Sequence, residues 1–434
     1  MKKFKLLIFQ SIKNNFKSGF IRKIFFIVAT ILFHNLVCFA EPIITLQDCY
    51  KSIYTNYPLI KNKNIILDKE KILTEIIEKG WKPGINIKSQ MTGQSDAVPK
   101  TPREKYGLQA DIEQLIYDGG LINKKIILES ENSKVEILKN ENELYQLRDK
   151  VNQFFFDIIL NENQIEILKT SYQDLDVKLK SIESAVRNGV RLKTDALIIR
   201  SEIINIEKEI SEKINNRKNS ILMLSSITGE KFEDTSIFKI PQLIENNSFS
   251  GQFDNRLELK IFEQEKRKLF VVDDMNYIKN KPVIYSFAQT GYANPALNMF
   301  EDKFEFYLIA GFRISWKPYN WGIENLEKKV SDERRKIIDI QKEDFIKKLN
   351  INELKLKNEI ENLKILIIKD LEIIKIKTEI LESITSQFNN GVLNSTDFIL
   401  HTNSLINAKK LLELRNVQLA YFKILLKTLR GEEL

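Results

Sequence analysis

Residues 187–195 read RNGVRLKTD, and residues 389–397 read NNGVLNSTD. Both stretches hold Gly-Val, three variable residues and then Thr-Asp, and each interrupts a long run of residues that favour helix. Glycine tolerates the positive φ at which many helices end, and Thr or Asp can cap the helix that follows. The pattern predicts two helical hairpins, with returning helices capped by Thr and Asp. Their tips would hold Gly189, Val190, Thr194 and Asp195 in the first hairpin and Gly391, Val392, Thr396 and Asp397 in the second.

The positions of the helix-breaking residues predict that both hairpins extend far from these tips. No proline lies between 103 and 240 or after 318, and Gly189 and Gly391 are the only glycines in 121–228 and 323–430. Inside a helix, proline costs about 3 kcal/mol and glycine about 1 kcal/mol, so such long gaps indicate helix. The predicted helices cover 120–186, 194–228, 322–387 and 396–430. The first of each pair would be about 100 Å long at the usual rise per residue.

A heptad pattern runs through the third of these helices. Ile346, Ile360 and Ile367 recur at multiples of seven, and Glu353 interrupts their row. A companion row holds Leu349, Leu356 and Leu363. This spacing predicts coiled-coil packing with imperfect heptads.

The two tips belong to a larger duplication. Gly189 and Gly391 are 202 residues apart, and so are the segments YDGGL at 117–121 and YNWGI at 319–323. Farther upstream, NYPLIK at 56–61 resembles NRLELK at 255–260. A near-constant offset across separate landmarks indicates an internal duplication.

Each repeat also holds two strand candidates, near 85–92 and 108–117 and near 283–292 and 304–316. Apolar and polar residues alternate along them, with aromatics near the ends, as in a transmembrane β-strand or a half-buried soluble hairpin. The largely apolar face would hold Leu108, Ala110, Ile112, Gln114 and Ile116, then Phe304, Phe306, Leu308, Ala310, Phe312, Ile314 and Trp316. Even small barrels use about eight strands, and open sheet edges are not tolerated in lipid. A membrane sheet of four strands would therefore close by oligomerisation.

The first forty residues resemble a secretory signal peptide, with a basic region, an apolar run from Ile24 to Phe33 and a small residue, Ala40, near the expected cleavage point. A membrane anchor and lipidation of Cys38 are the alternatives. The chain has 67 basic and 59 acidic residues, and seven of the basic ones lie in this leader. The mature chain would thus be nearly neutral, which argues against nucleic-acid binding.

The remaining chemistry-bearing residues are few. After the leader the chain keeps Cys49 and His401 alone of their types, far apart in sequence, and no glycine-rich phosphate loop. One Cys and one His form neither a zinc site nor a nucleophilic pair. We therefore expect no catalytic residues, metal or cofactor, and we expect Cys49 to be a buried small hydrophobe.

The duplicated order of helix, two strands, long helix, Gly-Val…Thr-Asp tip and returning helix resembles the TolC-type outer-membrane efflux protein family over residues 45–430. ITLQDCYKSIYTNYPL at 44–59 matches the opening pattern of that family, and Trp81-Lys82-Pro83 stands where its helix passes into its first strand. The resemblance implies a mostly helical α+β chain. Three such chains would form a twelve-stranded transmembrane β-barrel, four strands per chain, continued by a coiled-coil α-barrel in the periplasm.

The resemblance further implies an exit duct of a tripartite efflux or type I secretion system. Its partners would be itself as a homotrimer, a periplasmic adaptor at the tips, an inner-membrane efflux pump or ABC transporter, and outer-membrane lipid. The implied domains are a signal peptide at 1–40, a first repeat at 41–229, an equatorial linker at 230–254, a second repeat at 255–430 and a tail at 431–434.

The resemblance also places a periplasmic gate at the tips, with Asp195, Phe388 and Asp397 as candidates. An aromatic hydroxyl and a base that latch the closed tip in this family would fall at Phe388 and Leu393, which supply neither. We therefore expect no polar latch and closure by packing of Phe388. Two other classes fit parts of the pattern. A structural coiled-coil protein would lack the barrel, and a periplasmic adaptor would have one hairpin between small β-domains.

Overall fold

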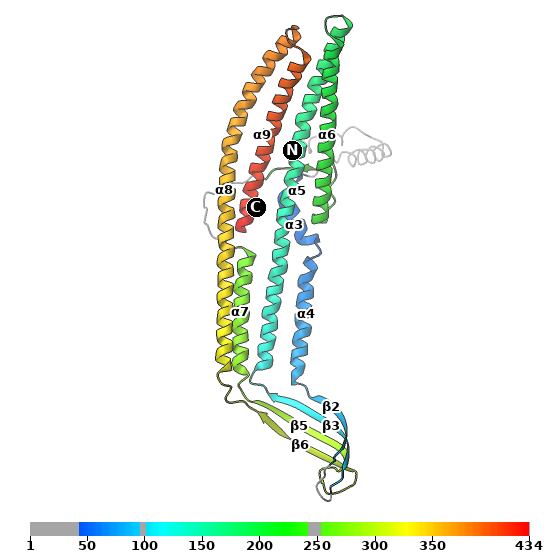
Figure 1. Cartoon of the computed structure of the whole chain (residues 1–434), viewed down its shortest axis with the longest axis vertical. Helices are drawn as coiled ribbons and strands as arrows, with labels where there is room; N and C mark the ends of the chain where they lie inside the picture. Colours follow the sequence, from blue (N-terminus) through cyan, green and yellow to red (C-terminus); the bar gives the residue numbers. More distant parts are fainter. Residues whose placement is uncertain (1–42, 96–100, 242–252, 434) are drawn as a thin grey trace, which may run out of the picture.

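The computed structural model describes residues 43–95, 101–241 and 253–433. The predicted leader, with Cys38 and Ala40, and residues 242–252 of the predicted linker lie outside the described residues. The described chain forms a long shaft of helices with a four-stranded sheet at one end and two hairpin tips at the other (Figure 1).

The two halves of the chain have similar but not identical orders of elements, with two helices and a 3-10 turn before the strands of the first half and one helix before those of the second. The first half contains α3 (Leu46–Asn56), α4 (Ile60–Glu78), a 3-10 turn (Lys79–Trp81), β2 (Gly84–Gly93), β3 (Glu104–Tyr117), α5 (Leu121–Arg187) and α6 (Lys193–Thr228). The second contains α7 (Leu257–Ile278), β5 (Val283–Asn294), β6 (Glu305–Ser315), α8 (Ile323–Asn389) and α9 (Ser395–Arg430). The four predicted hairpin helices are confirmed, with every end within two residues of its predicted place.

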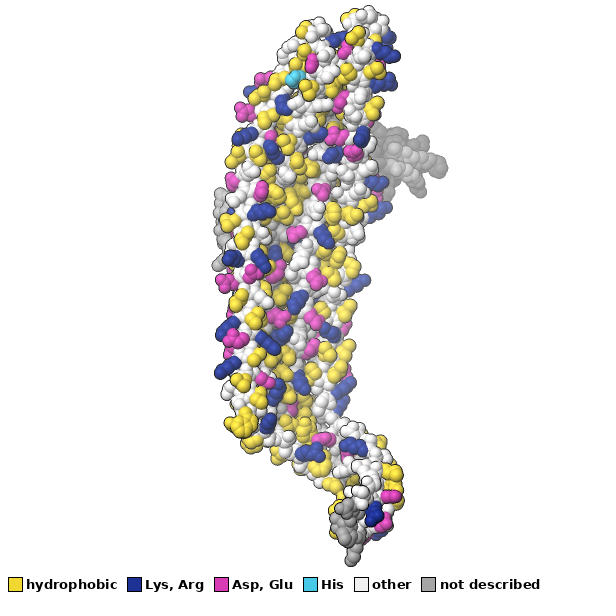
Figure 2. Space-filling view, viewed as in Figure 1, with side chains coloured by type: hydrophobic (Ala, Val, Ile, Leu, Met, Phe, Trp, Pro, Cys, Tyr) yellow, Lys and Arg dark blue, Asp and Glu magenta, His cyan; other side chains and the backbone are white. Residues whose placement is uncertain are grey.

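The two long helices α5 and α8 run the whole length of the shaft, and each has 67 residues. The returning helices α6 and α9 have 36 residues each and cover only the half next to the tips. Below them, α4 and α7 continue to the sheet (Figure 1). Figure 2 shows charged side chains of both signs interspersed along this shaft, with no large area of a single sign on the face drawn.

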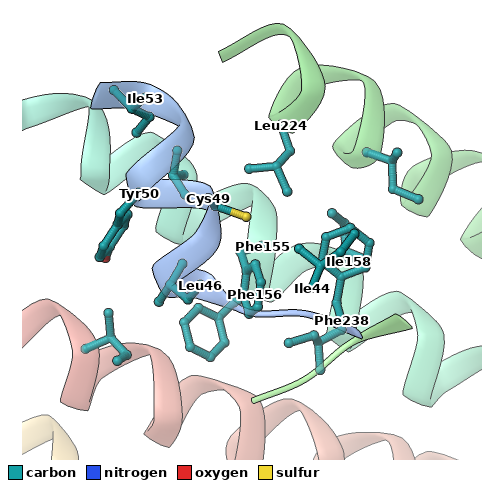
Figure 3. Packing of buried hydrophobic residues seen from close by; sticks show 14 of the residues in the cluster. Ile44, Leu46, Cys49, Tyr50, Ile53, Phe155, Phe156, Ile158, Leu224 and Phe238 are labelled. Atoms are coloured by element: carbon teal, nitrogen blue, oxygen red, sulfur yellow. The ribbon is translucent and has the colours of Figure 1, made fainter. Parts of the chain in front are cut away.

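A hydrophobic cluster fills the middle of the shaft, where returning helices, α3 and a short sheet meet (Figure 3). The short sheet pairs β1 (Ile43–Ile44) with β4 (Ile237–Phe238) in parallel. Phe155 is fully buried and meets Phe156 and Phe238 edge to face. Cys49 is a free, buried thiol here, as predicted, and burial followed by the nearby acidic charge of Asp48 raises its pKa to about 12. It therefore packs as an apolar group.

The main sheet has the strand order β2-β3-β5-β6, antiparallel throughout. Its register puts Leu108 opposite Tyr292 and Thr290 opposite Leu308, so Leu108, Ala110 and Ile112 share one face with the predicted apolar residues of β6. The prediction is wrong for Ile116, because the register shifts between Leu115 and Tyr117 and Tyr117, not Ile116, is the partner of Ile284. This face is exposed in the single chain; Phe306 and Phe312, for example, are 72% and 77% exposed. Strands β2 and β6 each have a neighbour on one side only, so both edges of the sheet are open.

On the opposite face of the sheet, aromatic rings lie against glycines of the neighbouring strand. Gly291 and Tyr307 are register partners, and a Cβ added at Gly291 would meet the Tyr307 ring at 2.7 Å. Gly311 and Phe287 are also register partners, and a Cβ added at Gly311 would meet the Phe287 ring at 3.2 Å. These glycines let the rings lie flat along the sheet, a packing known to support strand pairing next to glycine.

The seam between α8 and α9 contains two buried ion pairs. Glu353, the residue that interrupts the isoleucine row, is buried and accepts a hydrogen bond from Arg430 Nε at 3.0 Å. Asp370 follows Leu363 by seven residues, is also buried, and pairs with Arg415. Leu349, Ile360 and Leu363 are buried as the heptad pattern predicts. The heptad interruptions are therefore filled by acids that meet arginines of the returning helix.

No helix within the described part of the chain is long and apolar enough to cross a membrane.

Candidate functional site: the paired hairpin tips

The two turns have the same backbone structure. At the first, the Val190 amide donates to the Ala185 carbonyl at 2.9 Å and the Gly189 amide to Val186 at 3.1 Å. At the second, Val392 donates to Gln387 at 3.0 Å and Gly391 to Phe388 at 3.1 Å. This pair of bonds is the Schellman ending of a helix, which needs a left-handed residue after the cap. Gly189 and Gly391 supply it, with φ of +73° and +80°.

The predicted capping of the returning helices is wrong for all four of its residues. Leu192 and Asn394 occupy the N-cap positions, and the Thr-Asp pairs at 194–195 and 396–397 lie within the first turn. Asn394 accepts a hydrogen bond from the Asp397 amide at 2.9 Å, whereas Leu192 has no side-chain oxygen to offer. A capping side chain must stand before the first turn and accept from within it, and the Thr-Asp pairs come two residues too late.

Asp195 instead reaches across to the other hairpin. One carboxylate oxygen accepts hydrogen bonds from the Ser395 amide at 3.2 Å and from the Ser395 hydroxyl at 2.7 Å. Both residues are buried. Ser395 is the first residue of α9, so a carboxylate from the first hairpin lies at the positive end of a helix of the second, where negative charge is favourable.

Arg191 makes the second cross-link. One of its terminal nitrogens donates to the Leu393 carbonyl at 3.1 Å, and the other donates to the Phe388 carbonyl. Its guanidinium lies 4.5 Å from the centre of the Phe388 ring, within the range of a cation–π contact. Asp195 stands 3.9 Å away and balances its charge.

The ring of Phe388 is the centre of this contact. Phe388 is fully buried and stacks on Phe398, with ring centres 4.9 Å apart. The ammonium of Lys178, from α5, lies 4.9 Å from the Phe388 ring and also donates to the Asn389 side chain. Burial, and then the positive charge of Arg191, lowers the pKa of Lys178. We name Lys178, Arg191, Asp195, Phe388, Ser395 and Phe398 the tip clamp.

The clamp contains polar links that the family's latch positions do not supply. Phe388 is buried at its centre, and Arg191 and Asp195 bridge the two hairpins; a gating role for these residues stays a prediction. Leu393, where the resemblance places a base, lies 202 residues after Arg191, and the two are in contact. The base therefore stands one predicted duplication offset before the position that the resemblance gives it. That predicted offset could have located Arg191, whereas nothing local marks Lys178 or Ser395.

The other predicted site residues do not form a cluster. Val190 and Val392 are 75% and 70% exposed on the outermost turns. Thr194 and Thr396 are also exposed, and Asp397 is half-buried. Within residues 43–95, 101–241 and 253–433, no group of three or more His, Cys, Asp or Glu side chains is placed to hold a metal ion. The tips thus combine a buried polar clamp with an exposed apolar end.

This arrangement, with a sheet at one end, continuous long helices and paired tips at the other, is the fold of the TolC-type outer-membrane efflux channels, as the sequence predicted. The chain is similar to the outer membrane protein VceC from Vibrio cholerae, with a TM-score of 0.66 and 11% identity over 89% of this chain and 96% of that one. It is similar to the MtrE outer membrane channel of Neisseria gonorrhoeae in its open state, with a TM-score of 0.63 and 12% identity over 89% of each chain. It is also similar to the CmeC outer membrane channel of Campylobacter jejuni, with a TM-score of 0.63 and 10% identity over 89% of this chain and 85% of that one.

At the level of sequence alone, no protein-family model matches the chain, and no curated protein matches it. The likeness therefore lies in the fold.

Proposed function

We propose that this protein is the outer-membrane exit duct of a tripartite efflux or type I secretion system. Three chains would form a passive channel, joined through a periplasmic adaptor to an inner-membrane efflux pump or ABC transporter. The observation that carries the proposal is the sheet. It exposes large apolar side chains of β2, β3 and β6 on one face and has two open edges, β2 and β6. Lipid accepts such a sheet only when its edges are paired.

The helical shaft fits the same function. At 1.5 Å per residue, the 67 residues of α5 and α8 span about 100 Å, long enough to carry a conduit well away from a membrane. In this proposal residues 41–229 and 255–430 are the two structural repeats, 230–254 the equatorial linker and 431–434 the tail. The sheet lies in the outer membrane and the tips point into the periplasm.

The exposed parts of the tips would dock the adaptor. Gly189 and Gly391 keep the turns compact, and Val190, Thr194, Val392 and Thr396 present small side chains to a partner. Asp397 lies next to them on α9. Each such contact is weak alone, but a ring of chains repeats it and raises the total affinity.

The tip clamp would hold the periplasmic gate closed. Asp195 and Phe388 belong to it, and Asp397 is the acidic candidate beside it. Because the clamp joins the first hairpin to the second, separating the hairpins requires breaking the contacts of Arg191 and Asp195. A partner that competes for these contacts would open the entrance.

The first experiment is the mass of the detergent-purified protein together with its conductance in a planar bilayer. A trimer with stable conductance steps supports the duct. A monomer or dimer without conductance after verified refolding would overturn it and favour a structural coiled-coil protein.

The gate is tested in the same bilayer with Arg191→Ala and Asp195→Ala. Both variants should raise the conductance of the trimer, because each removes a link between hairpins. Arg200→Gln, which removes an exposed charge of α6, is the matched control and should leave conductance unchanged. Equal conductance in all variants would contradict the gating role of the clamp.

A further inference from the structure

The polar face of the main sheet carries an ordered network of charges. Lys88 of β2 pairs with Asp111 of β3 at 2.8 Å. Asp111 accepts a hydrogen bond from Gln109 of the same strand. Gln109 in turn accepts one from the hydroxyl of Tyr307 on β6 at 3.2 Å. Four side chains on three strands are therefore linked across one face.

A second pair lies beside this network on the same face. Arg313 of β6 pairs with Glu113 of β3 at 3.1 Å, across the intervening strand β5. Its guanidinium lies 5.2 Å from the centre of the Phe287 ring, and Phe287 is the register partner of Glu113. The two basic and two acidic residues thus form two cross-strand pairs of zero net charge.

These pairs remain accessible to water. The side chains of Lys88, Glu113 and Arg313 are 66%, 41% and 58% exposed. If the apolar face meets lipid, as the proposed function requires, this opposite face lines the water-filled bore. Solutes leaving the duct would pass directly over the four charges.

We infer that Lys88 and Arg313 neutralise the wall of the bore, so that anionic and cationic solutes pass the barrel without selection by charge. The inference rests on the proposed function and concerns its substrate class. The register places Lys105 and Glu305 on the same face, and their charges cancel. Without Lys88 and Arg313, Asp111 and Glu113 would therefore leave two unbalanced negative charges per chain, repeated around the ring. A wall lined by acids concentrates cations and repels anions.

The experiment measures the reversal potential of single channels in a planar bilayer under a KCl gradient. Lys88→Gln and Arg313→Gln should each raise the ratio of K⁺ to Cl⁻ permeability, by about two- to threefold in 0.1 M salt if three charges act near the bore axis. Asp111→Asn and Glu113→Gln should lower the ratio by a similar factor.

The controls separate charge from structure. Lys88→Arg and Arg313→Lys keep the charge and should keep the reversal potential of the parent protein. The double variant with Lys88→Gln and Asp111→Asn removes a neutral pair and should do the same. A parent protein without conductance would defeat the proposed function itself. A conducting trimer whose permeability ratio is unmoved by all four single variants would overturn only this inference.

Discussion

The two hairpins have equal lengths and the same Schellman tips, yet their seams are built from different chemistry. In the second hairpin, Glu353 and Asp370 of α8 are buried against arginines of α9. The residues 202 positions earlier, Val151 and Leu168 of α5, are fully buried and apolar. One backbone design therefore accepts both an apolar seam and a charged one. Apolar heptads stabilise such a seam, whereas buried polar positions fix which turns face each other.

The largest expected effect comes from removing one member of a buried pair. Arg430→Met leaves Glu353 buried with Lys357 as its remaining cation at 3.1 Å, and should lower the free energy of unfolding by about 3 kcal/mol. Urea denaturation of the purified protein measures the change. Adding Glu353→Val recreates the valine of the first hairpin and should restore stability to within about 1 kcal/mol of the parent. A double variant as unstable as the single one would show that the seams are not interchangeable.

A smaller effect is expected at the tips, where the hairpins differ in the role of their acids. Asp195→Asn keeps the shape but removes the charge that meets the Ser395 amide, and should cost about 1–2 kcal/mol. Hydrogen exchange of the Ser395 amide, which should accelerate, reports this bond directly. Asp397→Asn is the matched change in the second hairpin and should leave that amide protected. Equal acceleration in both variants would argue against a specific link.

Replacing either turn glycine by alanine should lower the stability of the protein by the same amount. Gly189→Ala and Gly391→Ala each force a side chain into the left-handed region, at a cost of about 1 kcal/mol. Neither has an atom within 4 Å of the added Cβ, so no steric clash adds to that cost. Thermal melting of the two variants should give equal shifts. A clearly larger shift in one of them would reveal strain in that hairpin alone.

Lowering the pH should produce the smallest difference in stability between the two hairpins. Burial raises the pKa of Glu353, but the hydrogen bonds from Arg430 and Lys357 outweigh it, and the net pKa is lowered. A carboxyl with a lowered folded-state pKa stabilises the fold above its unfolded pKa and loses this contribution as pH falls through the folded value. Hydrogen exchange at pH 7 and pH 4 should show α8–α9 loosening more than α5–α6 near this residue. The double variant with Arg430→Met and Glu353→Val should abolish this pH-dependent difference between the hairpins.

Much of the fold could be predicted because its signals are local. The absence of glycine and proline fixed the hairpin helices, period-two alternation identified the strands, and Gly189 and Gly391 marked the turns. The capping residues were misplaced because Asn394, rather than the repeated Thr-Asp pair, precedes the first turn of α9. Only three-dimensional geometry distinguishes these neighbouring positions.

Asp195 and Phe388 were expected at the tips, but the contacts of the clamp were not, because they join segments about 200 residues apart. Arg191 looks like one more exposed base in a chain rich in them, and no local pattern pairs Asp195 with Ser395. Their roles depend on how the two hairpins lie side by side, which no local pattern records. The predicted duplication offset between Arg191 and Leu393 is a sequence signal that could have indicated the contact.

The open edges of the sheet have a consequence for inheritance. No chain can complete its own wall, so in the proposed ring every copy depends on both neighbours to satisfy the backbone groups of β2 and β6. A cell that made sound and defective copies together would build mixed rings, and one faulty strand would disable two intact partners. Mutations in these two strands should therefore be dominant, while those confined to the interior of one hairpin should be masked by a sound copy.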